Sequence, residues 1–425
     1  MLPIVFVHGQ SGSAQQFETQ AMRFTSNGYP QDLLHAFEYD TTQDVNPLAD
    51  LDSFIDDVLA ETGAGQVHAI GHSRGTSVWT SYLDPAIGFG GAKVAKYVNI
   101  DGRDPDELPG GVPTIGIWGE WNTAGSEFNR RGGEAAQIGP DPAANFYFGD
   151  KSHTEVATSA EAFAVMYEFL TGEAPGTTAV LPEPPGQVEV SGRAVLFPEN
   201  VGYDGATVQV WKIDPDTGQR IGSRPRATFP IDESGGFGPV RVNSRQRYEF
   251  TIVRPGSGEE HHFYPQPFTR SDHFLRLNSS LPGSALDAIT PDGPDTTNIV
   301  VVRMKEFWGD QGDDSDELLV DGLNVLTPQT SPRSAVNLAV FVQDDELDGQ
   351  TDLGKGELFP FGLVSFITAV DVSVAASPDA DGVVTVTEVP RDGGEPRITN
   401  VPNWPSDTNA VTVPFPDAAR ASFPR

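Results

Sequence analysis

The first 172 residues alternate short apolar runs with longer runs whose apolar positions recur at helical spacing. The predicted strands are residues 4–7, 35–39, 67–70, 94–100, 114–118 and 145–148. The predicted helices between and after them are residues 15–27, 51–61, 76–83 and 159–170. Because strands that alternate with helices favour a parallel sheet covered on both faces, residues 1–172 are predicted to form an α/β domain.

The pattern changes after residue 172. Residues 173–186 are rich in Pro, Gly and Thr, which predicts a linker. From residue 187 to 425 the chain consists of short alternating runs with turn signals, for example 188–196, 207–213 and 247–253, and no amphipathic helix is predicted. This pattern predicts an all-β region, a sandwich or a barrel. A weaker break at 280–297 leaves open whether it is one β domain or two.

One short motif carries the strongest chemical signal. Gly71-His-Ser-Arg-Gly75 follows the apolar strand that ends at Ile70 and precedes a predicted helix. A serine at such a strand–turn–helix junction, bounded by two glycines, is the nucleophile elbow of a serine hydrolase. The flanking glycines permit a tight turn that lifts the hydroxyl clear of the sheet. Ser73 is therefore the predicted nucleophile, and an ordinary glycine-bounded loop is the alternative.

A serine needs a histidine that removes its proton and a carboxylate that orients the histidine. In this fold the chain order is serine, acid, histidine. His153 is the histidine of the α/β part that follows the acid candidates, and it lies in the loop after the last predicted strand. The acid is either Asp101, at the end of the strand 94–100, or Glu120, after the strand 114–118, and strand position alone does not choose between them.

The oxyanion of the tetrahedral intermediate needs two backbone donors. One is predicted to be the amide of Arg74, directly after the nucleophile. The other is predicted to be the amide of Gln10 in the glycine-containing loop after the first strand. A phosphate-binding loop is disfavoured there, because the sequence has neither G-x-G-x-x-G nor G-K-[ST].

Composition limits the class of protein. The 425 residues include no cysteine and have a formal net charge of −33. This charge disfavours nucleic acid and anionic membranes as partners, and it is compatible either with solubility alone or with life in high salt. No apolar run approaches the roughly 20 residues that span a bilayer. Residues 1–7 are predicted to be a buried strand rather than a signal peptide, so any export signal is expected upstream.

Two acidic segments resemble calcium loops. Ser377-Pro-Asp-Ala-Asp-Gly382 continues to Glu388 in an approximate D-x-D-x-D-G-x5-E pattern. Its flanks have strand patterns, so a hairpin turn at Asp381-Gly382 is the preferred interpretation. The second segment begins at Asp344, but Lys355 stands where a bidentate glutamate belongs. Calcium therefore remains a minor hypothesis.

These motifs together resemble the bacterial and archaeal lipases of the α/β-hydrolase superfamily, and among them the two-domain lipases of the Archaeoglobus type. The likeness covers residues 6–10, 16–24, 27–30, 71–75, Asp101-Gly102, 152–154 and 162–169, and it reaches 305–311 in the β region. It implies a Ser73–Asp101–His153 triad, and with it Asp101 as the acid. It also implies carboxylic ester hydrolysis, acylglycerols included, without metal or organic cofactor, and export from the cell.

The chain departs from this family pattern in one place. Lid-bearing relatives carry a long insertion before the helix that precedes the nucleophile strand, and here only residues 41–50 occupy that place. A short segment predicts an open cleft, weak interfacial activation and tolerance of bulky or polymeric esters. Two rival functions remain: an amide, lactone or carbon–carbon hydrolase on the same scaffold, and a lipid- or surface-binding protein with a vestigial hydrolase domain.

Overall fold

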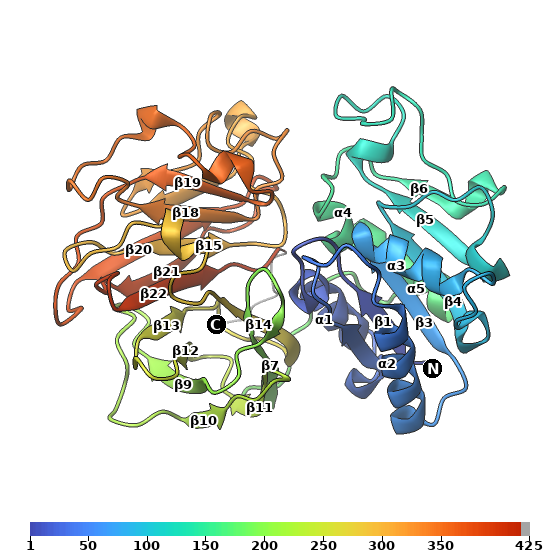
Figure 1. Cartoon of the computed structure of the whole chain (residues 1–425), viewed down its shortest axis with the longest axis horizontal. Coiled ribbons are helices and arrows are strands. Elements are labelled where there is room, and N and C mark those ends of the chain that lie inside the picture. Colours follow the sequence, from blue (N-terminus) through green and yellow to red (C-terminus); the bar gives the residue numbers. More distant parts are fainter. Residues whose placement is uncertain (418–425) are drawn as a thin grey trace. The chain divides into compact units, whose positions relative to one another are not determined.

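The computed structural model describes residues 1–417, which divide into two compact units (Figure 1). The first unit consists of Met1–Leu181 together with two later segments, Phe197–Val201 and Phe274–Arg276. The second unit contains Pro182–Leu196, Gly202–His273 and the chain from Leu277 onward. The first unit therefore includes short pieces of the chain that lie far beyond its main segment in sequence.

A parallel sheet forms the centre of the first unit, as the alternating pattern predicts. Its strands are β1 (Ile4–Val7), β2 (Leu34–Phe37), β3 (Val67–His72), β4 (Val94–Ile100), β5 (Thr114–Trp118) and β6 (Asn145–Tyr147). Their order across the sheet is β2-β1-β3-β4-β5-β6, and every neighbouring pair is parallel. All six carboxyl ends therefore lie along one edge of the sheet.

Helices cover both faces of this sheet. They are α1 (Glu18–Ser26), α2 (Leu48–Thr62), α3 (Arg74–Leu83), α4 (Glu155–Thr158) and α5 (Ala160–Thr171). Side chains alternate between the two faces of a strand, and β1 shows the result. Ile4 and Phe6 belong to one buried cluster with α1 and α5, whereas Val5 and Val7 belong to another with α2 and α3.

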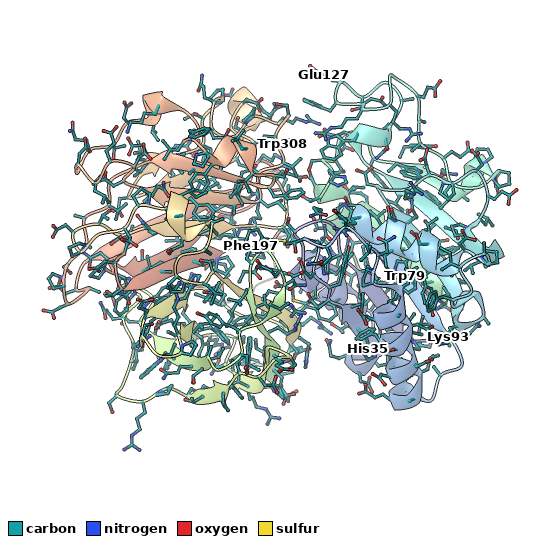
Figure 2. The ribbon with its side chains drawn as sticks, in the orientation of Figure 1. His35, Trp79, Lys93, Glu127, Phe197 and Trp308 are labelled. Carbon is teal, nitrogen blue, oxygen red and sulfur yellow. The ribbon has the colours of Figure 1, made fainter. Side chains whose placement is uncertain are left out.

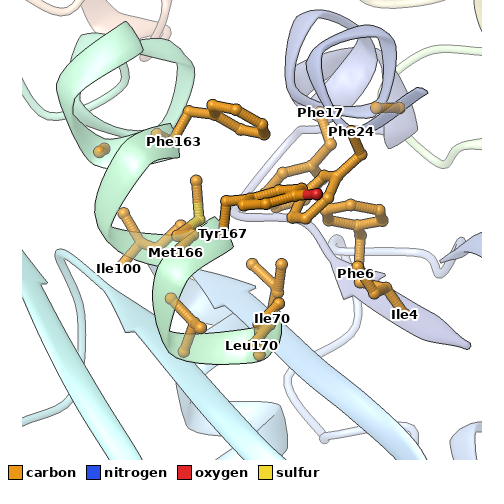
Figure 3. Packing of buried hydrophobic residues seen from close by; sticks show 14 of the residues in the cluster. Ile4, Phe6, Phe17, Phe24, Ile70, Ile100, Phe163, Met166, Tyr167 and Leu170 are labelled. Carbon is orange, nitrogen blue, oxygen red and sulfur yellow. The ribbon is translucent and has the colours of Figure 1, made fainter. Parts of the chain in front are cut away.

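The aromatic packing of the α1–α5 face is shown in Figure 3. Phe24 of α1 contacts Phe163 of α5 edge to face, with ring centroids 5.1 Å apart, and Phe6 lies against Phe17 at 4.9 Å. On the other face lies the fully buried Trp79 of α3, which is labelled in Figure 2. Its indole hydrogen is donated to the Ile70 carbonyl at 3.1 Å. Both faces thus hold the ends of β1 and β3 in fixed positions.

The chain after residue 186 is built from strands, in agreement with the predicted all-β region. The strands are β7 (Val188–Leu196), β8 (Val201–Gly202), β9 (Thr207–Ile213), β10 (Ala227–Pro230), β11 (Gly236–Val242), β12 (Arg247–Val253), β13 (Glu260–Phe263), β14 (Asp272–Ser279), β15 (Ile299–Val302), β16 (Glu317–Val320), β17 (Leu323–Asn324), β18 (Ala339–Gln343), β19 (Ile367–Asp371), β20 (Val383–Val389), β21 (Arg397–Pro402) and β22 (Asn409–Pro414). Between residue 187 and residue 417 the only helices are short 3-10 turns.

These strands form an eight-stranded sheet, β10-β9-β12-β13-β22-β15-β18-β19, and two four-stranded sheets, β11-β7-β14 with β8, and β17-β16-β20-β21. The large sheet draws strands from both sides of the predicted break at 280–297, since β22 pairs in parallel with β13 and with β15. Val301, Val340 and Val413 of the eight-stranded sheet share one buried cluster with Val386 and Val401 of the β17-β16-β20-β21 sheet.

The predicted hairpin at Asp381-Gly382 is wrong. The strand before it, β19, pairs with β18, and the strand after it, β20, pairs with β16 and β21, so the flanking strands belong to different sheets. The tight turn of this segment has Pro378 and Asp379 at its centre and is closed by the Ala380 amide on the Ser377 carbonyl at 2.9 Å, so Asp381 and Gly382 follow the turn. An Asp-Gly step specifies a tight turn but not which strands pair on either side of it.

Within the described residues no helix is both long and apolar enough to cross a membrane.

Candidate active site

Three predicted site residues meet at the carboxyl edge of the parallel sheet. Ser73 follows β3, Asp101 follows β4, and His153 lies in the loop between β6 and α4. The Ser73 hydroxyl lies 2.9 Å from His153 Nε2, and His153 Nδ1 lies 2.7 Å from Asp101 Oδ2. Because Nδ1 donates to the carboxylate, Nε2 is the acceptor for the serine hydroxyl. This geometry suits removal of the serine proton by the imidazole.

Ser73 occupies a sharp turn between β3 and α3. Its φ of 52° and ψ of −120° lie in a region that side-chain-bearing residues seldom adopt. The flanking glycines make the turn possible. A Cβ on Gly71 would lie 2.8 Å from Trp79 Cδ1, and one on Gly75 would lie 2.1 Å from the Val7 carbonyl oxygen. The two glycines of the motif thus let α3 pack directly on β1 and β3.

The His153 ring is fixed by stacking as well as by hydrogen bonds. It lies face to face on the Trp121 indole, with centroids 4.1 Å apart and planes 9° from parallel. The Arg130 guanidinium lies over the same indole at 3.3 Å from its centroid, and the Arg130 amide donates to the Trp121 carbonyl. The indole is therefore held independently of His153 and gives its ring a fixed surface.

Asp101 is buried and fully hydrogen-bonded. While Oδ2 accepts from His153, Oδ1 accepts from the Gly119 amide at 2.7 Å and from Asn122 Nδ2 at 2.8 Å. Burial alone would raise the pKa of the Asp101 carboxyl, but the hydrogen bonds from His153, Asn122 and Gly119 hold this pKa below its ordinary value. The carboxylate is thus ionised and aimed at Nδ1.

The other candidate acid, Glu120, lies beside this site without occupying it. Glu120 opens the 3-10 helix η5 (Glu120–Asn122), and its amide donates to the Lys151 carbonyl at 2.8 Å. The carboxyl that lies at hydrogen-bonding distance from His153 Nδ1 is that of Asp101. The acid that the structure places beside His153 is therefore Asp101, the one that the family resemblance implies.

The loop after β1 approaches the serine closely. A Cβ on Gly9 would lie 3.0 Å from Ser73 Cβ, so the backbone at Gly9 passes directly beside the turn. In residues 1–417, the amides of Gln10 and Arg74 donate no hydrogen bond to a backbone or side-chain acceptor. The amide of Arg74 is at the first position of α3, where helical geometry leaves it free. Both predicted oxyanion donors are thus available.

The side chains of Gln10 and Arg74 bind the short segment between β2 and α2, which occupies the place of the lid in lid-bearing lipases. Arg74 Nη1 donates to Gln10 Oε1 at 2.8 Å, and the guanidinium also donates to the carbonyls of Thr41 and Gln43. Gln10 Nε2 donates to the Thr41 carbonyl at 2.9 Å. Residues 38–47, between β2 and α2, contain no helix.

Several neighbours of the site were not predicted. Trp121 and Asn122 lie in η5, which no regular apolar pattern marks in the sequence, and Gln16 lies in the 3-10 helix η1 (Ala14–Phe17) just before α1. His72 had a visible signal, since it directly precedes the serine, but chain order excluded it as the base. Two further residues, Asn200 and Arg276, reach the first unit from the β-rich part of the sequence.

The calcium hypothesis receives no support from the side chains. Among residues 1–417 no group of three or more His, Asp or Glu side chains is arranged to hold a metal ion. The Glu388 carboxylate accepts from Arg303 and Arg397. Asp344 accepts from the amides of Asp348 and Gly349, and Lys355 Nζ lies 2.8 Å from Asp371. The acidic segments are thus closed by their own amides and by basic side chains.

Comparison with known proteins finds three family models along the chain. Residues 1–84 match the class 2 lipases, residues 186–282 match a lipase C-terminal domain, and residues 285–419 match a further C-terminal domain. The first match contains Gln10 and Ser73, whereas Asp101 and His153 lie beyond it.

Solved structures match less than half of the chain, at low identity. A gene product of Listeria innocua is 16% identical over 42% of this chain and 97% of its own, with a TM-score of 0.31. The mature lipase of Bacillus licheniformis is 17% identical over 40% of this chain and 92% of its own, with a TM-score of 0.30. An acetylxylan esterase is 13% identical over 40% and 99%, with a TM-score of 0.25.

The family matches and the sheet topology agree with the resemblance found in the sequence. The class 2 lipase match covers the strand–turn–helix segment around Ser73, and the two C-terminal matches cover the β-rich remainder. The three matches and the sheet topology together support a two-part lipase or esterase, in which an α/β-hydrolase domain is followed by a C-terminal β region.

Proposed function

We propose that this protein hydrolyses carboxylic esters through a covalent acyl-enzyme on Ser73. One observation carries the proposal: the hydrogen-bonded series from the Ser73 hydroxyl through His153 to the buried Asp101, with 2.9 and 2.7 Å between its members. A serine in this setting loses its proton to a neutral imidazole, and the carboxylate stabilises the imidazolium that forms.

In the first half-reaction Ser73 Oγ attacks the ester carbonyl carbon as its proton moves to His153 Nε2. The carbonyl oxygen becomes an oxyanion, which accepts hydrogen bonds from the amides of Gln10 and Arg74. The intermediate then collapses, the bond between the carbonyl carbon and the alkoxy oxygen breaks, and His153 gives the proton to the departing alcohol. The products of this half are the free alcohol and an acyl ester of Ser73.

In the second half-reaction water takes the place of the alcohol. His153 Nε2 removes a proton from the water, and the resulting hydroxide attacks the acyl carbon, again with the oxyanion at the two amides. Collapse of this intermediate returns the proton to Ser73 Oγ and releases the carboxylic acid. Asp101 keeps Nδ1 as the donor throughout, so Nε2 remains the atom that exchanges protons.

The proposal extends to substrate class and location. The segment of residues 38–47 is short, and the side chains of Arg74 and Gln10 bind it. No long lid therefore folds over the Ser73 turn from this position. An uncovered turn favours bulky or polymeric esters, acylglycerols included, as substrates. Export from the cell and adaptation to high salt stay predictions, the first from the family resemblance and the second from the net charge of −33. Fractionation of the native host and activity across a salt series test them.

The decisive experiment is hydrolysis of p-nitrophenyl esters from acetate to palmitate. The wild type is expected to turn over at least part of the series, and Ser73→Ala is expected to lose about three or more orders of magnitude in kcat. Ser53→Ala, an exposed position on α2, is the matched control and should keep wild-type activity. Wild-type protein that is inert on every ester, at low and at high salt, would refute the proposal and favour a binding protein. Paired ester and amide substrates would separate an esterase from an amidase.

A further inference from the structure

We propose that Gln16 and His72 are positioning residues that couple the oxyanion loop to the loop of the catalytic histidine. The inference rests on the proposed ester hydrolysis. Neither side chain is required as an acid, base or nucleophile in that mechanism. Both lie between the two loops whose relative placement the mechanism needs.

The coupling is a continuous series of hydrogen bonds. The Gly9 amide donates to Gln16 Oε1 at 3.2 Å, which leaves the Gln16 amide nitrogen as the donor to His72 Nδ1 at 2.6 Å. His72 Nε2 then donates to the backbone carbonyl of His153 at 2.8 Å. Since a carbonyl oxygen can only accept, this last bond fixes the His72 tautomer, and every donor and acceptor in the series is matched.

The series begins and ends at the reacting groups. Gly9 lies beside Ser73 and directly precedes Gln10, the proposed oxyanion donor. His153 is the proposed base, and its ring centroid lies 4.7 Å from that of His72. A shift of Gln16 or His72 therefore moves the Gln10 amide relative to the His153 imidazole.

Burial makes the series rigid and keeps it neutral. Gln16 is 6% exposed and His72 is 1% exposed, so neither side chain has an alternative partner in water. Burial, followed by the charge of His153, lowers the pKa of His72 to about 3. At neutral pH His72 therefore keeps a free lone pair on Nδ1 for Gln16 and a hydrogen on Nε2 for the His153 carbonyl.

Catalysis is sensitive to such placement. Amides that stabilise an oxyanion and an imidazole that takes a proton must be held to about 0.5 Å. A displacement of about 1 Å costs up to about 100-fold in rate, even when it originates away from the reacting atoms. Loss of the coupling is therefore expected to lower kcat rather than to raise KM.

Gln20, four residues after Gln16 and in α1, offers a matched control. It is as buried as Gln16, and its Nε2 donates to the carbonyls of Ala157 and Ser159 at 2.8 and 3.1 Å. Gln20 thus ties α1 to the segment before α5 without joining the oxyanion loop to His153. Gln16→Met and Gln20→Met remove the same kind of buried amide, so they separate positioning from general loss of stability.

The test compares Gln16→Met, Gln20→Met, His72→Phe and His72→Gln with the wild type on a soluble p-nitrophenyl ester, with thermal unfolding of each variant. Gln16→Met and His72→Phe are expected to lose about 10- to 100-fold in kcat, with KM within about threefold. Gln20→Met is expected to keep kcat even where its melting temperature falls. His72→Gln is expected to recover much of the rate, because its amide can still donate to the His153 carbonyl.

Labelling of Ser73 by a phosphonate ester gives a second readout, and its rate is expected to fall in parallel with kcat. Gln16→Met with wild-type kcat, or Gln16→Met and Gln20→Met with equal losses of kcat, would overturn the inference while the proposed function stands. A wild type that neither turns over esters nor reacts with the phosphonate would refute the proposed function itself, and the positioning role with it. If Gln16→Met does not fold, the comparison of His72→Phe with His72→Gln decides: equal loss overturns the inference.

Discussion

Gly75 and Val7 approach each other so closely that a methyl group on residue 75 would lie 2.1 Å from the Val7 carbonyl oxygen. This contact is where α3 crosses β1, directly behind the turn that carries Ser73. The backbone of a strand cannot yield as the end of a flexible side chain can. The second glycine of the motif is thus required by the packing of a helix on a strand, and through that packing it sets the position of the serine.

Gly75→Ala is therefore expected to reduce both stability and activity. Forcing a methyl into this contact requires α3 to move away from β1, at a cost of about 1–3 kcal/mol or more. Gly91→Ala is the control, because a Cβ at Gly91 meets no atom within 4 Å. Urea unfolding and ester hydrolysis should show a loss for the first variant only. Two variants of equal stability would show that α3 adjusts without strain.

Much of the first unit could be predicted because its strands are short, apolar and separated by periodic helices. The buried strands β1, β4 and β5 begin and end where the apolar runs do, and the glycines around Ser73 mark the turn. Ser73 and His153 could be chosen from motif and chain order alone. The choice between Asp101 and Glu120 could not, because both follow apolar strands and only the orientation of each side chain distinguishes them.

Contacts between distant parts of the sequence could not be predicted. Phe274 belongs to the buried cluster of α1 and α5, and Asn200 Nδ2 lies 3.2 Å from His8 Nε2, yet both residues come from the β-rich part of the chain. Nothing in the local pattern of residues 197–201 or 274–276 indicates this membership. The strand pairing around Asp381-Gly382 failed for the same reason, since a turn signal carries no information about the sheet to which each strand belongs.

The assignment of the acid leads to a direct comparison. Asp101→Asn is expected to lower kcat by about 10⁴-fold with little change in KM, because an amide no longer holds His153 Nδ1 as the donor. Glu120→Gln, the variant of the other candidate, is expected to keep kcat within about tenfold. Steady-state kinetics of the two purified variants make the test. The opposite ranking would place the acid at Glu120.

A buried ion pair joins Arg276 to Glu38 inside the first unit. Arg276 Nε donates to Glu38 Oε1 at 2.8 Å, and the two side chains are 4% and 10% exposed. Glu38 also accepts from the Ala14 amide at 2.9 Å, just before α1. Arg276→Met would leave the carboxylate buried without its cation and is expected to cost about 3 kcal/mol of unfolding free energy.

The exposed pair of Arg241 and Glu189 provides the comparison, since its side chains are 66% and 38% exposed. Arg241→Met is expected to cost less than about 1 kcal/mol. Denaturant unfolding of both variants at one salt concentration gives the two values. Equal losses would show that the pair at Glu38 contributes no more than a surface contact.

His68 on β3 makes stability depend on pH. Burial, with the positive charges of Lys96 and the N-terminus, lowers the pKa of His68 to about 4. The unfolded chain binds a proton at this residue below about pH 6.5, while the folded chain stays neutral there until about pH 4. As the pH falls across this window, the unfolding free energy is therefore expected to fall by on the order of 1 kcal/mol per pH unit from His68 alone.

His68→Gln removes this titration, so the difference in unfolding free energy between wild type and variant should be constant above pH 6.5. Below pH 6.5 the wild type should become steadily less stable relative to His68→Gln as the pH falls. Urea unfolding at pH 7.5, 5.5 and 4.5 measures it. Parallel stability curves for the two proteins across the whole range would contradict the argument.

The short segment after β2 determines how the enzyme is expected to respond to an interface. A lid that opens on lipid produces a sharp rise in rate when the substrate passes its solubility limit. Here residues 38–47 contain no helix, and the Arg74 guanidinium and the Gln10 side chain bind the carbonyl of Thr41. The rate on a short-chain triacylglycerol should therefore rise smoothly through the limit. A sharp jump at the limit would show that some segment covers Ser73 and has to move. Arg74→Met frees residues 41–43, so a jump that disappears in this variant would identify residues 41–43 as the segment that moves.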